Sequence, residues 1–229
     1  PGAEPNLTTD IGLNRFTWNF RMSNATTLPG LIMWGGSLAG PRVAPGNYQV
    51  RLTVDGKVVA TESFAIKADP RIRVTQDDFQ KQYDFLAKTN EKLSATHGAI
   101  LEIRDLKKQL DDLSGRMRPE QKDLKDRAGE IGKKLTTIEE ELIQTKIRSG
   151  QDALNFPIRL NNKLAALASL VDGSDDAPTA QAYDVYNDLT AKIDVQLALF
   201  TRLKMEDIAA FNKAYAEKGL PVIVTKQKP

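Results

Sequence analysis

The chain of 229 residues contains no cysteine and only one histidine, His97. The missing thiols exclude disulfides, cysteine nucleophiles and cysteine-based zinc or iron–sulfur sites. Zinc usually needs three or four converging nitrogen, sulfur or oxygen ligands, and here only carboxylates could join the lone imidazole. We therefore predict no catalytic residue, no cofactor and no metal site, and we interpret His97, on an apolar helix stripe, as a core residue.

Long apolar runs are missing too, because even residues 164–171 fall well short of the roughly 18 to 20 residues that span a bilayer. We therefore predict no transmembrane segment. The start, Pro1-Gly2-Ala3-Glu4-Pro5, lacks the initiator Met and the basic and apolar regions of a signal peptide, so we expect a mature or truncated chain. The net charge is only +2, so we expect no nucleic acid partner.

Glycine, proline and charge change together after Val74. The first 74 residues hold 8 of the 15 glycines, 6 of the 11 prolines and both tryptophans, but only 13 of the 62 charged residues. A β domain followed by solvated helices is expected to show such a shift.

The first part predicts β-structure. Four apolar residues alternate after the turn at Ala44-Pro45-Gly46, namely Tyr48, Val50, Leu52 and Val54. Asp55-Gly56 then supplies a two-residue turn and residues 58–66 return, which predicts a β-hairpin. With further strands expected at 12–20 and 31–34, residues 1–70 predict a small immunoglobulin-like (Ig-like) β-sandwich. Residues 1–70 provide about five strands, whereas a complete sandwich has about seven, so we expect an incomplete sheet edge or one covered by something upstream.

The second part predicts helices, because apolar residues recur in steps of four and three, as in coiled coils. Thr75-Gln76-Asp77-Asp78 predicts a helix start, and this helix extends to about Leu113. Three more are expected, one opened by Pro119, one at 158–171, and one from Pro178 to Tyr215. The predicted fold class is thus α+β multidomain: the sandwich, an antiparallel four-helix up-down bundle at 75–218, and a C-terminal tail at 219–229.

Two acidic clusters have simple structural interpretations. Residues 172–176 lack the spacing and the final glutamate of a calcium loop, so we interpret them as a solvated turn. Consecutive helix positions point in different directions, so residues 139–141, all glutamate, predict a solvated face rather than an acid/base pair. Asn90 and His97, seven residues apart on one stripe, favour a role in register or core hydrogen bonding.

Three residues are candidates for a binding patch. Trp18 and Trp34, with nearby aromatics, could bind a glycan weakly, or they could form the core of a small domain. Arg159 lies in an unusual stretch, residues 155–162, which could bind a ligand or form a capped loop with a locally paired arginine.

Several motifs together resemble a known group of proteins. They are Gly12-Leu13-Asn14-Arg15-Phe16-x-Trp18, Ala44-Pro45-Gly46-x-Tyr48-x-Val50-x-Leu52-x-Val54-Asp55-Gly56, and Pro157-Ile158-Arg159-Leu160-Asn161-Asn162-Lys163-Leu164. The chain resembles, over nearly its whole length, the C-terminal region of large bacterial secreted proteins. Their N-terminal part is a sortilin-like β-propeller of sialidase-type (BNR) repeats, often labelled glycosyl hydrolase.

The resemblance implies a tail module that lies outside the cytoplasm, whether periplasmic, cell-surface or secreted. No catalytic residue is carried over, because the propeller is not in this sequence. Our leading hypothesis is a non-catalytic interaction or scaffolding module that contacts a protein partner or a neighbouring domain of the same polypeptide. The alternatives are the tail of a secreted sialidase-like glycoside hydrolase, and a stand-alone subunit of a bacterial envelope assembly.

Overall fold

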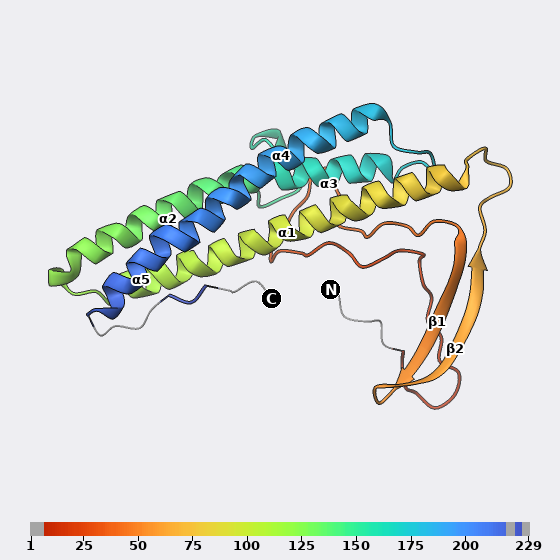
Figure 1. Ribbon diagram of the computed structural model, residues 1–229, viewed down its shortest axis with the longest axis horizontal. Helices are drawn as coiled ribbons and strands as arrows, with labels where there is room; N and C mark the ends of the chain where they lie inside the picture. Colours follow the sequence, from red (N-terminus) through yellow and green to blue (C-terminus); the bar gives the residue numbers. More distant parts are fainter. Residues whose placement is uncertain (1–6, 219–222, 226–229) are drawn as a thin grey trace.

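The alternating residues around Asp55-Gly56 form the predicted hairpin in the computed structural model, which describes residues 7–218 and 223–225. β1 (Gly46–Val54) pairs antiparallel with β2 (Lys57–Ile66). Asp55 and Gly56 have positive φ, 48° and 75°, as a type I′ turn requires. Figure 1 shows this hairpin projecting from one end of an elongated set of helices. We call residues 46–66 the hairpin arm.

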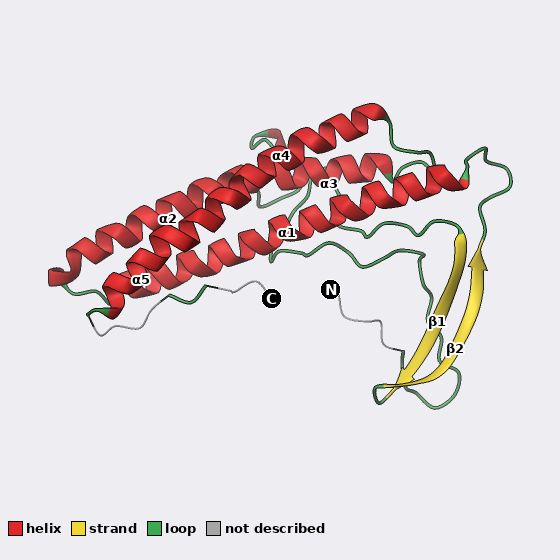
Figure 2. Cartoon of the chain, in the orientation of Figure 1, coloured by secondary structure: helices red, strands yellow, loops and turns green. Residues whose placement is uncertain are grey.

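The predicted Ig-like β-sandwich is wrong. Within the described residues, β1 and β2 make the one sheet, and no side chain of either strand is fully buried. Residues 7–45 are irregular chain (Figure 2), with a single isolated bridge between Arg21 and Arg42. Over the described part of the predicted domain, an irregular segment followed by a two-stranded arm takes the place of the sandwich.

The other two expected strands do not form, and backbone bends lie at their ends. Gly12 and Phe20, the end residues of the expected strand at 12–20, have φ of 116° and 59°, and an extended strand needs negative φ. In the described chain the residues between them join no sheet. Gly30 and Gly35, with φ of 70° and 66°, likewise enclose the expected strand at 31–34 between two bends.

The helical part begins where the sequence predicts. Thr75 Oγ1 accepts a hydrogen bond from the Asp78 N–H (3.2 Å), and the Asp78 carboxylate accepts one from the Thr75 N–H (3.0 Å), which makes a capping box. The α-helices of the described chain are α1 (Gln76–Ser114), α2 (Lys122–Leu142), α3 (Leu160–Val171), α4 (Ala180–Leu203) and α5 (Ala209–Ala216). Short 3-10 helices lie at Pro119–Gln121 and Asp152–Leu154. A π-helical turn, Lys204–Ile208, joins α4 to α5 and divides the fourth predicted helix.

The hydrophobic core lies between these helices. α1 packs against α2, α3 and α4, and α2 packs against α4 and α5, so the long helices lie along one another (Figure 1). Several fully buried side chains come from the predicted four-three stripes, namely Ile100, Leu124, Leu135, Leu142, Leu164 and Ile193. The packing that holds the fold is therefore helical, and the hairpin arm lies outside it.

The irregular N-terminal segment is nevertheless docked on the helices. Ala25 and Leu28 are buried in the helical core. At Gly36 a Cβ atom would lie 2.8 Å from the Cβ of Ala165 in α3, so only glycine permits this close approach. Residues 25–36 thus form one more layer on the bundle.

A short C-terminal segment also packs on the helices. Ile223 is buried, and its N–H and C=O bond the side-chain amide of Asn212 at 2.9 and 2.8 Å. Gln109 pairs in the same way with Val224, at 2.9 and 3.1 Å. Residues 219–222 and 226–229 of the predicted tail, and residues 1–6 at the start, lie outside the described residues. Among the described helices, none has both the length and the apolar character that a bilayer crossing requires.

Candidate functional site

An aromatic cluster sits at the base of the hairpin arm. The Tyr48 and Phe64 rings stack with centroids 6.0 Å apart, and Trp18 meets them edge-on at 6.1 and 6.3 Å. Phe20 packs on Trp18 at 5.6 Å, and the Trp18 indole N–H donates to the Arg21 carbonyl (2.8 Å). Trp18 therefore fastens the N-terminal segment to the hairpin through aromatic contacts.

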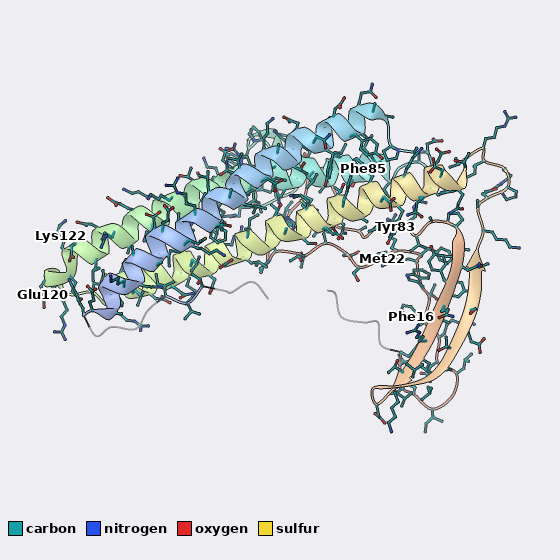
Figure 3. The ribbon with its side chains drawn as sticks, viewed as in Figure 1. Phe16, Met22, Tyr83, Phe85, Glu120 and Lys122 are labelled. Atoms are coloured by element: carbon teal, nitrogen blue, oxygen red, sulfur yellow. The ribbon has the colours of Figure 1, made fainter. Side chains whose placement is uncertain are left out.

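Towards the tip, the same face of the hairpin arm is open. Val50, Leu52 and Val54 follow Tyr48 at alternate positions, so their side chains share its face, yet they are 57%, 43% and 49% exposed. Phe16, which Figure 3 places beside the hairpin, is 50% exposed. The aromatic cluster thus covers only the base of an apolar surface. We call Val50, Leu52 and Val54 the distal face.

A charged clamp fixes the chain near the arm to the bundle. Arg21 makes a bidentate pair with the Asp172 carboxylate at 2.7 and 3.2 Å. Arg42 reaches the same carboxylate (3.4 Å) and the Asp172 carbonyl (2.9 Å) at the end of α3. The interpretation of residues 172–176 as a merely solvated turn is therefore wrong for Asp172, because two guanidinium groups hold it.

Trp34 and Arg159 lie near the first turn of α3, away from the Trp18 cluster. The Trp34 N–H donates to Asn162 Oδ1 (2.8 Å), and Asn162 Nδ2 donates to the Trp34 carbonyl (2.7 Å). Arg159 is the residue before α3 and pairs loosely with Glu141 at 3.7 Å. Because Trp18 packs on the hairpin instead, the three candidate residues do not make one patch. Binding at any of them stays a prediction.

His97 is fully buried at the centre of a small polar network. Its Nδ1 lies within hydrogen-bond reach of the Thr26 carbonyl, which can only accept, so Nδ1 carries the proton. Nε2 is then an acceptor for the Asn161 side-chain amide (3.2 Å). Burial lowers the pKa of His97, outweighing the bond to Thr26 that raises it. This neutral histidine joins the N-terminal segment, α1 and α3, which is a structural role.

A cleft of about 1080 Å³ lies on the helical part of the described chain. Its walls are the Pro29-Gly30 turn, the α1 surface around Arg104, and the α2–α3 connection at residues 143–159. That connection is held by Asp152, whose carboxylate accepts bonds from the Arg148 N–H (2.7 Å) and the Ser149 N–H (2.9 Å). The same bonds hold the pKa of Asp152 below its usual value.

A buried carboxylate lies in the wall of this cleft. Glu139 has a side chain only 5% exposed, and its two oxygens bond Arg104 Nε (2.7 Å) and Lys107 Nζ (3.1 Å) from α1. The predicted solvated face at 139–141 is therefore wrong for Glu139. Its position, four residues after Leu135 and three before Leu142, places it beside the buried stripe, and this spacing could have revealed it.

Comparison with known proteins adds no functional assignment: no protein-family model, no curated protein and no solved structure matches this chain.

Proposed function

We propose that this chain is a non-catalytic interaction module whose hairpin arm contacts another domain or protein. The observation that carries the proposal is the open distal face. A two-stranded hairpin is marginal in water unless further strands or a helix cover its apolar side. Here Trp18 and Phe20 cover the base, while Val50, Leu52 and Val54 stay about half exposed.

The partner that fits this surface is a β-strand-bearing protein surface. In the described chain each strand of the arm pairs on one side only, so each has one edge of backbone N–H and C=O groups that can accept a further strand. Every second side chain of a strand added there would lie beside the distal face and extend the apolar surface whose base Trp18 and Phe20 cover.

The attachment of the arm suits such a role. The clamp of Arg21 and Arg42 on Asp172 holds the chain before β1 on the bundle, and Gln76 at the start of α1 donates to the Pro45 carbonyl (2.8 Å). An arm fixed at its base presents its tip in one orientation, which lowers the entropy cost of docking.

The resemblance of the sequence motifs supports a wider context. On that basis we place the module in the C-terminal part of a larger extracytoplasmic bacterial protein with a β-propeller, where it acts as a scaffold. The arm would then contact either a domain of that same polypeptide or a separate protein.

Site-specific photo-crosslinking tests the proposal. A photoreactive amino acid is placed at Leu52 on the distal face, and a control is placed at Thr61, which is exposed and faces the opposite side of the arm. In the native source, we expect crosslinks from position 52, mapped by mass spectrometry to a β-strand, and few from position 61. Equal crosslinking at both positions, or none at position 52, would contradict the proposal.

A second measurement distinguishes a module of a larger polypeptide from a separate chain. It is the intact mass of the native polypeptide, recovered with an antibody against the helices. A species several times larger than 25.3 kDa would support a module of a larger protein. A species of about 25.3 kDa would contradict that context and make the crosslinked protein a separate partner.

A further inference from the structure

The cleft between α1 and the α2–α3 connection carries more hydrogen-bond donors than its own acidic residues use. Arg104 donates to Glu139 through its Nε, and Lys107 donates to the same carboxylate through one of its three N–H groups. Both side chains are about one-third exposed, at 37% and 30%, so their remaining donors can reach solvent in the cleft. A buried carboxylate between two cations leaves one positive charge at this wall.

Two further arginines line the cleft on the side of the α2–α3 connection. Arg148 bonds the carbonyls of Thr145 and Ile147 through Nη1, and no described acid pairs with its remaining donors. Arg159 is held only loosely, by Glu141 at 3.7 Å. The connection is stiffened by Asp152, so these guanidinium groups extend from a wall that is ordered before a ligand arrives.

The acidic residues of the cleft do not cancel this set. Lys108 and Asp112 form their own pair at 2.8 Å. The other lining charges are four basic residues, Arg104, Lys107, Arg148 and Arg159, and three acidic ones, Asp111, Glu139 and Glu140. Among the lining residues this leaves an excess of one positive charge, and Glu141, the loose partner of Arg159, lies outside the lining. The first turn of α3 adds partial positive charge to this excess, because helix N-termini carry partial positive charge and the Arg159 side chain makes no capping bond there.

We propose that this cleft binds an oxyanion group, a carboxylate or a phosphate, that bonds Arg104 and Lys107 on α1 and reaches Arg148 or Arg159 opposite. Glu139 is the fixed counter-ion that orients the two α1 cations. The proposal does not depend on the hairpin arm, which lies outside the cleft. Arg104 would contact the ligand directly through its Nη groups, in the two-point geometry that guanidinium favours with oxyanions.

Binding is tested on the full chain by two-dimensional proton–nitrogen NMR, at constant ionic strength, with citrate and inorganic phosphate as separate probes. We expect saturable shifts of signals from the cleft, with a Kd of about 1 mM or tighter for at least one probe. Saturation by citrate alone would assign a carboxylate, by phosphate alone a phosphate, and by both a general oxyanion site. Linear shifts without saturation for both probes would overturn the proposal.

Substitutions identify the site. Arg104→Gln should weaken binding about ten-fold or more, because a charge-assisted bond is lost. If that variant fails to fold, Arg148→Gln and Arg159→Gln, both at solvent-accessible side chains, are expected to weaken binding several-fold when combined. The matched control is Lys192→Gln, which breaks a surface pair with Asp188 on α4 (2.7 Å) and removes the same charge. An equal loss in the control would mean general charge attraction and would refute the site.

Discussion

The pairing of Glu139 with two cations predicts a large loss of stability in Glu139→Ala. Removing one partner of a buried ion pair costs about 3 to 5 kcal/mol when the remaining charge stays buried. Here Arg104 and Lys107 are 37% and 30% exposed, so they regain water and the loss is smaller. We expect a decrease of about 2 to 3 kcal/mol in the free energy of unfolding, well above the 0 to 1 kcal/mol of a surface pair.

Urea unfolding followed by far-ultraviolet circular dichroism measures this difference, and the sequence supplies matched controls. Glu140 and Glu141 are exposed neighbours of the same type, so Glu140→Ala and Glu141→Ala should change stability by about 0.5 kcal/mol or less. A Glu139→Ala variant as stable as these two controls would refute the reasoning, because the buried network would then contribute no more than surface charge.

Three further predictions concern packing and pH. Because burial lowers the pKa of His97 in the folded state, the unfolded chain gains a proton near pH 6.5 while the folded chain does not. The free energy of unfolding should thus fall as pH drops below about 6.5, and this group should contribute at most about 1.4 kcal/mol per pH unit. In His97→Gln, urea midpoints measured across this pH range should fall less than in the unmodified chain. Gly36→Ala would press a Cβ against Ala165 and should destabilise by about 1 to 3 kcal/mol. Gly98→Ala, in the middle of α1 with open space around it, should instead stabilise by about 0.5 to 1 kcal/mol, so thermal unfolding of the two glycine variants should shift in opposite directions.

The elements that the sequence predicts correctly all have local signals. Asp55-Gly56 between two alternating runs specifies the hairpin, because that turn needs two positive φ angles. Thr75 with Asp78 specifies the start of α1 through a capping box. The four-three spacing specifies part of the buried stripe of each long helix, because residues three and four apart lie on one side. In α1 the prediction is incomplete, since Phe85 and Thr89 are buried beside it while Asn90 is only half-buried.

Alternating apolar and polar residues indicate only that a strand has one apolar side. They do not indicate how many strands accompany it, and the sandwich prediction is wrong for this reason. The distal face satisfies the alternation and remains open in the described chain. Phe20 ends the segment expected as a strand at 12–20 with a φ of 59°, a conformation that aromatic residues rarely adopt and that no local sequence pattern predicts.

The clamp and the cleft were beyond sequence reasoning because their residues are distant in the chain. Arg21 and Arg42 stand 151 and 130 residues before Asp172. Arg104 and Glu139 stand 35 residues apart on different helices. Each pair depends on how helices and irregular segments pack, and only Glu139 carried a local hint in its helical spacing.

The side-chain amides show how irregular segments can replace missing strands. An extended segment lying on helices has backbone N–H and C=O groups that no sheet satisfies, and leaving them buried and unpaired is costly. Asn162, Asn212 and Gln109 each bond both groups of one residue, at Trp34, Ile223 and Val224. An asparagine or glutamine therefore does here what a neighbouring strand does in a sheet. This accounts physically for Asn162 in the first turn of α3, where the sequence suggested only capping.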